Sequence, residues 1–198
     1  MRIVIQQNMT LDGRVEMLDD WFDPGGQDDD LAAELRDQSA REDVLLLGRQ
    51  TFCDLRGYWP HLRHDPTGVA QHLNRVDKRV VSATLTEPGW ENSSVVEGDA
   101  LAAVRSLREQ PGQDVVVTGS IQLCHALIPA GLVDEYRVFV YPAWQGRGRG
   151  LFPQGYAVPP LRLLRATSFT NGVTFAAYEP AASVEGDRER APDSAVPE

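Results

Sequence analysis

The sequence predicts an α/β fold in which a mainly parallel central sheet carries helices on both faces and ends in an antiparallel C-terminal hairpin. Short apolar runs typical of buried strands alternate with helical segments, and this alternation is typical of a parallel sheet covered on both faces. Two of the runs, residues 44–47 and 114–117, end close to a glycine that precedes a helix. The dipeptide Asn171-Gly172 lies between two extended runs, which predicts a hairpin turn.

Hydrophobic and β-branched runs predict the strands. In the first of them polar and apolar side chains alternate, as they do in a strand with one buried face. The inner strands are shorter and more continuously apolar. In chain order, strands are expected over residues 2–7, 44–47, 78–82, 95–96, 114–117, 134–141, 161–170 and 173–178.

Capping residues and apolar periodicity predict four helices. Leu31 and Leu35 share one face of the first, which runs to about residue 41. Asp99 has the side chain of a good N-cap for the third. The expected helices begin at Asp28 or Asp29, at Gln50, at Asp99 and at Ser120, and the last stops at Pro129-Ala130-Gly131.

The remaining segments predict loops and a tail. Residues 8–14 are turn-rich, residues 19–30 are acidic, and residues 57–68 form a long irregular stretch. The C-terminal segment is charged, contains proline and has no aromatic residue. We therefore expect one domain over residues 1–180 and a disordered acidic tail over residues 181–198.

Composition excludes several classes of protein. A formal net charge of −10 argues against nucleic acid as a partner, because neutralising phosphates needs a basic face. No apolar stretch is long enough for a signal peptide or a membrane span, so we expect a cytoplasmic protein that binds no membrane. Cys53 and Cys124 lie in apolar helical contexts, which predicts reduced core thiols. The four histidines form no ligand pattern, so no metal is expected.

Two strand-to-helix turns carry groups suited to anions. Gly48 is followed by Arg49 and Thr51, and Gly119 is followed by Ser120. The first N–H groups of a helix have no partner within it, and hydroxyl and guanidinium groups are further phosphate donors. Two such turns in one small domain predict a ligand with more than one phosphate, of which a dinucleotide is the simplest.

The negative net charge bears on this predicted site. It repels an anionic ligand at long range, so a phosphate site needs positive charge nearby. The candidates for that local charge are Arg49, Lys78 and Arg79.

Six short motifs occur in order along roughly residues 2–179. They are Thr10-Leu11-Asp12-Gly13, Leu47-Gly48-Arg49-Gln50-Thr51, Val81-Ser82-Ala83-Thr84-Leu85, Thr118-Gly119-Ser120, Gly131-Leu132-Val133-Asp134-Glu135-Tyr136 and Pro142-Ala143-Trp144-Gln145-Gly146-Arg147-Gly148. In this order they resemble the dihydrofolate reductase-like superfamily, most closely the reductase domain of the riboflavin-biosynthesis deaminase–reductase. The resemblance implies that superfamily's three-layer fold.

The resemblance also implies NADPH as the cofactor. The turn after residue 47 would touch the cofactor phosphates, residues 82–84 would lie near the 2′-phosphate, and residues 119–123 would cradle the pyrophosphate. The loop at residues 10–12 would lie by the nicotinamide and the substrate. The implied cofactor-binding residues are Thr10, Leu11, Gly48, Arg49, Gln50, Thr51, Ser82, Ala83, Thr84, Gly119, Ser120, Ile121, Gln122 and Leu123.

Substrate contacts and a proton donor are expected beside the nicotinamide. We expect Asn8, Trp21 and Thr118 to contact the substrate, with Trp21 as an aromatic wall for a flat heterocycle. Asp12 and Glu34 are the candidate catalytic carboxyl groups, because hydride transfer to a heterocycle also needs a proton. The alternatives are that Asp12 belongs to a plain turn and that Glu34 faces solvent.

Two positions depart from the patterns of the superfamily. Pyrimidine reductases align a glutamate with Thr118, and threonine cannot replace that charge. True dihydrofolate reductases have Gly-Gly where this chain has Gly119-Ser120. The sequence therefore matches neither substrate signature in full.

The function that we expect is NADPH-dependent reduction of a pyrimidine- or pterin-like heterocycle. The most specific candidate is reduction of 5-amino-6-(5-phosphoribosylamino)uracil in riboflavin biosynthesis. The alternatives are a dihydrofolate reductase and a non-catalytic NADPH-binding protein. A homodimer is expected, because the apolar face of residues 136–141 and the closing hairpin suit subunit pairing and the last strands often pair two subunits in this family.

Overall fold

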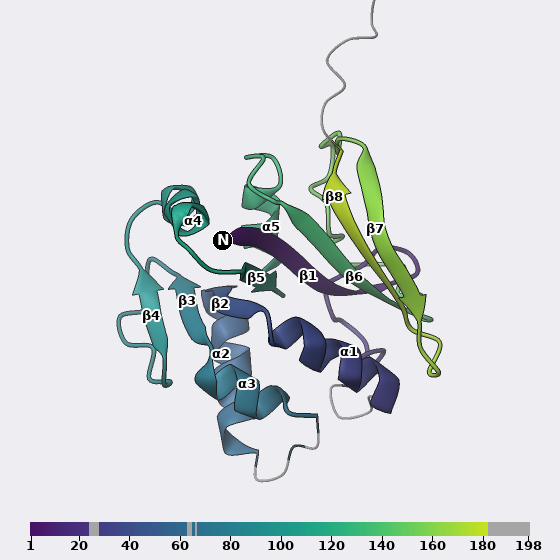
Figure 1. Cartoon of the computed structure of the whole chain (residues 1–198), viewed down its shortest axis with the longest axis horizontal. Coiled ribbons are helices and arrows are strands. Elements are labelled where there is room, and N and C mark those ends of the chain that lie inside the picture. Colours follow the sequence, from purple (N-terminus) through teal and green to yellow (C-terminus); the bar gives the residue numbers. More distant parts are fainter. Residues whose placement is uncertain (24–27, 63–64, 66, 182–198) are drawn as a thin grey trace, which may run out of the picture.

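The structure, a computed structural model, describes residues 1–23, 28–62, 65 and 67–181, and within them a single mixed sheet of eight strands. The strand order is β4-β3-β2-β5-β1-β6-β8-β7 (Figure 1). The first six of these are parallel, and β8 and β7 then pair antiparallel at one edge. The strands are β1 (Arg2–Thr10), β2 (Glu42–Gly48), β3 (Asp77–Val81), β4 (Ser93–Val96), β5 (Asp114–Thr118), β6 (Glu135–Tyr141), β7 (Leu161–Ser168) and β8 (Thr174–Pro180).

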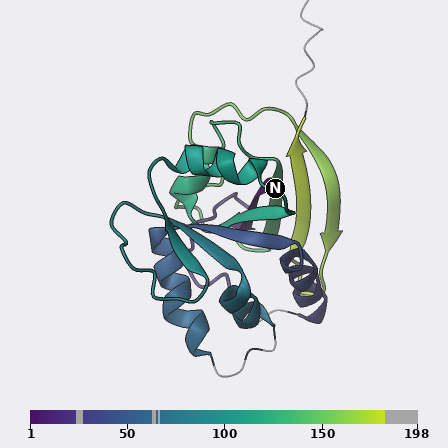
Figure 2. The same cartoon turned by 60° about the vertical axis from the view of Figure 1, so that its left-hand side comes forward.

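Helices cover both faces of the sheet, as predicted. Three lie on one face and two on the other (Figures 1 and 2). They are α1 (Asp29–Ser39), α2 (Arg49–Tyr58) and α3 (Val69–Arg75) on the first face, and α4 (Ala100–Glu109) and α5 (Ile121–Leu127) on the second; a short 3₁₀ turn, Trp59–His61, follows α2. The predicted α/β fold class is thereby confirmed. No helix in this part of the chain is long and apolar enough to cross a membrane.

Alternate side chains of the central strands fill two cores. Val4 of β1 packs with Phe52 of α2 and Leu73 of α3, whereas its neighbours Ile3 and Ile5 pack with α4 and α5. Because successive strand residues point to opposite faces, near-continuous apolar runs are what a sheet covered on both sides requires. A third cluster joins α1 to the β6–β8 side of the first face.

Two local predictions differ from the structure. Residues 8–14 are expected to form a loop, but β1 continues to Thr10 because β6 pairs with it as far as Tyr141. Residues 69–75 form α3, which the sequence pattern does not predict; the helix follows the left-handed Gly68 and buries Ala70 and Leu73. The predicted tail at 181–198 lies, apart from its first residue, outside the described part of the chain.

A buried ion network joins the amino ends of the inner strands. Arg137 of β6 is 1% exposed and contacts Asp114 of β5 at 2.7 Å and Glu135 at 2.6 Å. Arg2 of β1 contacts the same two carboxylates at 2.7 and 2.8 Å. Burying charges is costly unless each has partners of opposite sign, so the network fixes how β5, β1 and β6 align.

Removing Arg137 should destabilise the fold strongly. We predict that Arg137→Met lowers the free energy of unfolding by about 3–5 kcal/mol, because two buried carboxylates lose their buried partner and keep only the half-exposed Arg2. Arg162→Met is the matched control: Arg162 pairs with Glu179 on the exposed β7–β8 surface, where the loss is expected to be about 0–1 kcal/mol. Urea unfolding measures both, and equal losses would contradict the assigned role of the network.

Candidate functional site

The two predicted anion turns lie side by side, because β2 and β5 are adjacent parallel strands. The turns are also hydrogen-bonded to each other. The Gly48 N–H donates to Ser120 Oγ at 2.8 Å, and the Ser120 N–H donates to Thr51 Oγ1 at 2.8 Å. The start of α2 and the start of α5 therefore form one continuous surface at the carboxyl end of the sheet.

Gly119 is required for this close approach. Its φ of +56° is a left-handed conformation that favours glycine. A Cβ there would lie 2.7 Å from Thr51 Cγ2, well inside van der Waals contact. Ser120 is also left-handed, with φ of +43°, a conformation that costs energy in a non-glycine residue. Such strain persists only where the surroundings hold it, and here the bonds to Gly48 and Thr51 do so.

Gln7 of β1 supports the same turn and was not among the predicted site residues. It is 4% exposed, and its Nε2 donates to the Gly119 carbonyl at 2.7 Å. Since β5 ends opposite Gln6, the residues of β1 from Gln7 onward have β6 on one side and the Gly119 turn on the other. A glutamine at an inward position of a buried strand is the sequence signal that could have identified it.

Several donors of the paired turns remain available. Thr51 and Ser120 use their hydroxyl oxygens as acceptors, which leaves each O–H free to donate. Arg49 is exposed at the start of α2 and makes no ion pair with any described residue. Gln50, by contrast, is exposed and donates to Asp54 at 2.8 Å.

The segment 82–84 follows β3, next to the Gly48 turn. Ser82 Oγ accepts hydrogen bonds from the N–H groups of Thr84 and Leu85, while Ala83 and Thr84 are exposed. This geometry presents a tight turn to a ligand bound over β2 and β3.

Neither of the other two predicted cations belongs to the phosphate site. Lys78 is fully buried at the beginning of β3, where its Nζ donates to the carbonyls of Leu73 and Val76 near the end of α3. It also lies 4.7 Å from the Trp90 ring centroid. Arg79 pairs with Asp77 at the same end of the strand. The expectation for these two residues was wrong, because Lys78 is buried at the amino end of β3 and Arg79, in the middle of the strand, is paired with Asp77.

The first residues of α5 differ in what they can offer a ligand. Gln122 is exposed and Ile121 is half-buried. Leu123 is buried and its side chain packs in the core, so only its backbone can face the turn. Thr10 is buried, and Leu11 is 65% exposed with its N–H bonded to the Ala143 carbonyl.

Polar side chains from β1 and β5 form a floor between α1 and α2. Gln6 is paired with Thr118, so the two share a face, and Asn8 lies on the same face two residues further along. All three are half-buried, and their side chains make no hydrogen bond with any described residue. Two of the predicted substrate contacts, Asn8 and Thr118, therefore lie close to each other.

Trp21, the third predicted substrate contact, lines a separate hollow at the end of β6. This hollow has a volume of about 250 Å³ and is also lined by Asp23, Tyr141 and Asn171. The ring centroids of Trp21 and Tyr141 are 5.5 Å apart. Phe22 packs against both rings and closes the aromatic group on one side.

The loops after β1 and β6 hold each other through Asp12 and Gln145. Asp12 accepts hydrogen bonds from the Thr10 hydroxyl at 2.6 Å and from the N–H groups of Gln145 and Gly146 at 3.2 and 2.8 Å. The Gln145 side chain accepts from Trp21 Nε1 at 2.9 Å. It also bonds Leu18 N–H and the carbonyls of Glu16 and Arg147. Gln145 was not predicted as a site residue.

This environment determines the ionisation of Asp12. The Thr10 hydroxyl holds the pKa of Asp12 well below its usual value, against the opposing effect of partial burial, and the two backbone N–H groups add to the lowering. Asp12 is therefore an ionised carboxylate at neutral pH, and its geometry is that of the turn alternative.

Glu34 of α1 lies away from the paired turns. It receives two hydrogen bonds from Arg165 of β7 and one from Gln38 at 2.5 Å. Burial acts to raise the pKa of Glu34, but the bonds from Arg165 and Gln38 outweigh it and the pKa falls below its usual value. The structure thus shows Glu34 paired with an arginine rather than free in solvent.

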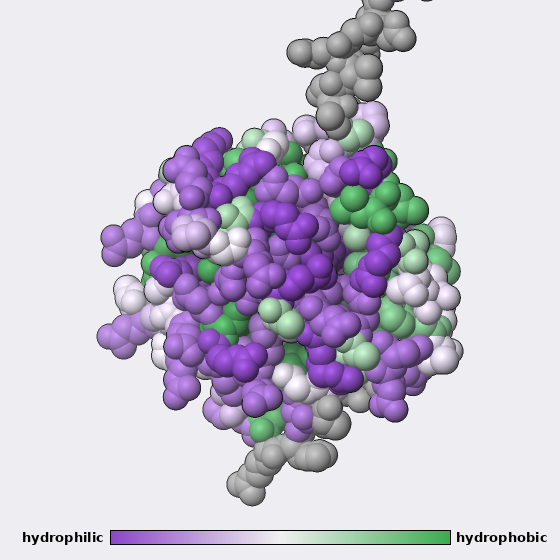
Figure 3. Space-filling model, in the orientation of Figure 1, coloured by the Kyte–Doolittle hydropathy of each residue, from purple (hydrophilic) through white to green (hydrophobic). Residues whose placement is uncertain are grey.

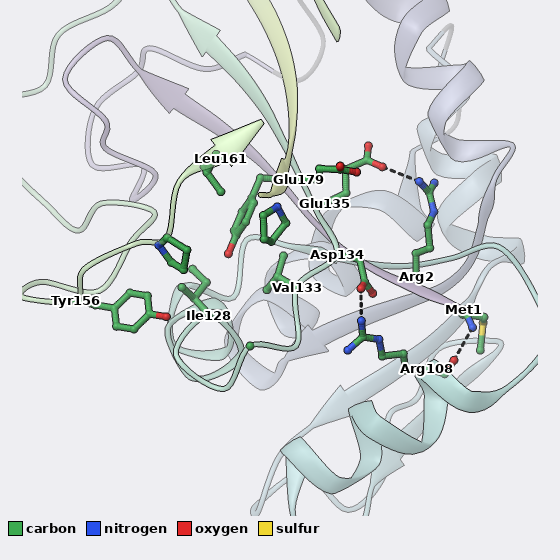
Figure 4. Close-up of a pocket in the computed structure, with 14 residues that line it drawn as sticks. Met1, Arg2, Arg108, Ile128, Val133, Asp134, Glu135, Tyr156, Leu161 and Glu179 are labelled. Atoms are coloured by element: carbon green, nitrogen blue, oxygen red, sulfur yellow. Dashed lines mark hydrogen bonds and ion pairs between the residues drawn. The ribbon is translucent and has the colours of Figure 1, made fainter. Parts of the chain in front are cut away.

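A larger hollow, of about 700 Å³, lies at the opposite end of the strands, by the amino ends of β1 and β6 (Figure 4). The labelled charged groups are already paired: Arg108 contacts Asp134, Arg2 contacts Glu135, and the Met1 amine contacts the Arg108 carbonyl. Glu179 is paired with Arg162. In open α/β sheets ligands bind beyond the carboxyl ends of the strands. The smaller hollow, at the carboxyl end of β6, is therefore the better candidate for a substrate.

The paired turns fit a pyridine dinucleotide. They combine a glycine cradle that any Cβ would fill, unpaired N–H groups at two helix starts, two available hydroxyl protons and the unpaired Arg49. Neighbouring strands are about 4.8 Å apart and rise about 3.3 Å per residue, so the distance from the Gly119 turn across β1 to the end of β6 is roughly 14 Å, because Tyr141 pairs with Thr10 and Thr118 with Gln6. A dinucleotide seated on the turns can therefore extend its reactive ring toward the aromatic hollow.

Comparison with known proteins agrees with this geometry. The family model of the RibD C-terminal domain matches residues 2–175. The uncharacterized protein YyaP of Bacillus subtilis is 28% identical over 179 residues, which cover 89% of this chain and 94% of that protein.

Solved structures show the same fold at low sequence identity. A putative riboflavin biosynthesis protein from Shewanella has a TM-score of 0.68 at 18% identity and covers 90% of this chain and 98% of its own. A pyrimidine reductase-like protein from Corynebacterium diphtheriae has a TM-score of 0.61 at 17% identity, over 90% and 91% of the two chains. The deaminase/reductase of Thermotoga maritima gives 0.61 at 17%, over 90% of this chain and 56% of that one. With its sheet order, its paired glycine turns and a family match over most of its length, the chain belongs to the RibD C-terminal domain family.

Proposed function

We propose that this protein is an NADPH-dependent reductase of a pyrimidine- or pterin-like heterocycle. Members of the RibD C-terminal domain family are typically NAD(P)H-dependent reductases. The observation that carries the proposal is the joining of the Gly48 and Gly119 turns by two hydrogen bonds, with Arg49 unpaired beside them. One rigid anion site with a free guanidinium is what a dinucleotide pyrophosphate needs.

The residues of this chain would bind and orient the reactants. The bound nicotinamide supplies the hydride, so the protein's task is positioning and exclusion of water. Gln7 holds the Gly119 turn, and the polar floor of Gln6, Asn8 and Thr118 offers hydrogen bonds to a ring lying over β1. Trp21 supplies the aromatic wall, with its indole fixed by Gln145.

The proton that accompanies the hydride would come from solvent. Asp12 and Glu34, the expected catalytic carboxyl groups, both have pKa values below their usual range and are engaged by several donors. A general acid needs a pKa near the working pH. We therefore propose that Asp12 fixes the loop after β1, that Glu34 anchors α1 to β7, and that a water molecule donates the proton.

A homodimer is part of the proposal. β7 forms an edge of the sheet, and all but the first of its residues are exposed. Leu163 and Leu164 are 51% and 41% exposed, and an apolar area lies over this strand in Figure 3. A long uncovered edge strand can pair with another chain, and a second copy with the same edge is the simplest partner.

Binding of the cofactor tests the core of the proposal. We predict that Arg49→Ala weakens NADPH binding roughly tenfold or more, because a hydrogen bond to a charged group contributes about 1.5–3 kcal/mol. Calorimetry gives the dissociation constant. Arg105→Ala on α4 is the control, since Arg105 is also exposed and helical and makes no ion pair with any described residue. Unchanged affinity, or equal loss in both variants, would refute the phosphate role of Arg49.

The glycine cradle can be tested independently of charge. Gly119→Ala should abolish measurable NADPH stabilisation in a thermal shift assay, because the new Cβ displaces Thr51 and with it Ser120. Gly131→Ala is matched: its φ of +65° imposes similar strain, of about 1–2 kcal/mol, but a Cβ there meets nothing within 4 Å. If both variants bind NADPH normally, the turns are not the cofactor site.

Light scattering tests the dimer. We expect a mass near twice the 21.9 kDa of the chain, and Leu163→Glu should shift it to the single-chain value by placing charge in the proposed strand pair. Leu18→Glu changes a similarly exposed leucine, 46% exposed, in the loop after β1 and should leave the dimer intact. A wild-type protein of single-chain mass would rule the dimer out.

A further inference from the structure

The substrate hollow lies within a strongly acidic part of the surface. Residues 11–23, residues 28–30 at the start of α1 and the loop at 142–152 together contain eight carboxylates and three arginines. Two of these carboxylates reach the hairpin loop that lines the hollow: Asp30 accepts from the Thr170 N–H at 2.9 Å, and Asp28 accepts from the Thr170 hydroxyl at 3.2 Å. A ligand entering here meets a field that repels anions.

The three arginines of these loops are all paired with carboxylates. Arg14 contacts Asp12 at 3.4 Å. Arg147 contacts Asp19, and Arg149 contacts Glu16, each at 2.5 Å. A guanidinium that already has a carboxylate partner adds little net positive charge for a second anion.

No other described cation is placed to replace them. The chain's only lysine, Lys78, is buried at the amino end of β3 with its Nζ bonded to two carbonyls. Arg165 is bound to Glu34. Arg49 makes no ion pair with any described residue, but it follows β2 at the dinucleotide turn, and both β5 and β1 lie between β2 and β6 with its hollow.

The volume of the hollow suits a small substrate. Its volume of about 250 Å³ is below the range of about 300–1,000 Å³ typical of drug-sized ligands. It has room for one heterocyclic ring system against Trp21 and Tyr141. A phosphate attached to that ring would extend over the acidic loops. There it would be repelled by carboxylates, with no unpaired cation of the described residues to bind it.

We propose that the substrate of this reductase carries no phosphate and is a neutral or cationic amino-substituted heterocycle. Ring amino groups are donors, and Asp23 and Asn171, which line the hollow, carry acceptor oxygens. Both residues also have partners within the protein, and Asn171 Oδ1 accepts from the Val173 N–H at 3.0 Å. The aromatic pair stacks on the ring and also favours positive over negative charge. The inference rests on the proposed function, because it assigns Arg49, a cation with no ion-pair partner among the described residues, to the cofactor.

Three ligands distinguish the possibilities: 5-amino-6-(5-phosphoribosylamino)uracil, the same compound after removal of its phosphate, and a neutral dihydropterin. Binding to the NADP⁺-loaded protein is measured by calorimetry, and oxidation of saturating NADPH is followed at 340 nm, both at low and high potassium chloride. We expect at least tenfold higher affinity and kcat/KM for an unphosphorylated ligand. Added salt should improve only the phosphorylated one, because it screens repulsion.

Preference for the phosphorylated compound, or weakening of its binding by salt, would overturn the proposal. So would a failure of all three ligands to bind the loaded protein. Failure of NADP⁺ and NADPH themselves to bind is a different result, since it refutes the proposed function and not only the substrate class.

A pair of variants tests the electrostatic cause. Asp19→Asn removes the partner of Arg147, whereas Asp20→Asn removes an adjacent exposed carboxylate that has no partner among the described residues. Both change the net charge equally. Asp19→Asn should improve binding of the phosphorylated ligand about threefold more than Asp20→Asn, as expected for one freed charge at a few ångströms in water. Equal effects would show that arginine pairing is not what excludes the phosphate.

Discussion

The adjacency of β2 and β5 is the constraint on which the site depends. Because the two strands are neighbours, the turns that follow them come close enough for Gly48 to donate to Ser120 and for Ser120 to donate to Thr51. Neither turn is complete alone, since each supplies a partner that fixes the other. A pyrophosphate would meet one preorganised surface in place of two independent loops, which reduces the entropy lost on binding.

Arginine–carboxylate pairs have different roles at the two ends of the strands. At the amino ends, Arg137 is buried with Asp114 and Glu135 and joins neighbouring strands. Beyond the carboxyl ends, arginines and carboxylates pair in exposed loops, where such pairs contribute little to stability. On the proposal made above, these pairs affect which ligands bind. With the loop arginines paired and Arg49 without an ion pair, the described residues offer positive charge to one anionic ligand and not to a second.

The architecture was predictable because it depends on periodicity and turn chemistry. The apolar run before Gly48 and the Asn171-Gly172 hairpin act locally, and both appear where predicted. The roles of Gln7 and Gln145 were not predictable, since each bonds to atoms more than a hundred positions away in the chain. The prediction that Lys78 belongs to the phosphate site was wrong for the same reason. The sequence shows a lone cation, but only the structure shows that it lies at the far end of β3 from the turn.

Asp12 shows why a motif can be in the right place and have a different role. It follows β1 beside the expected nicotinamide position, but an acid must hold a proton before it can give one. The Thr10 hydroxyl and two N–H groups of the neighbouring loop instead stabilise its ionised form. Those bonds place Gln145, which in turn fixes the Trp21 indole. The carboxylate therefore acts on the hollow at the end of β6 through the position of the Trp21 ring, and the pairing of these two loops explains why their motifs occur together.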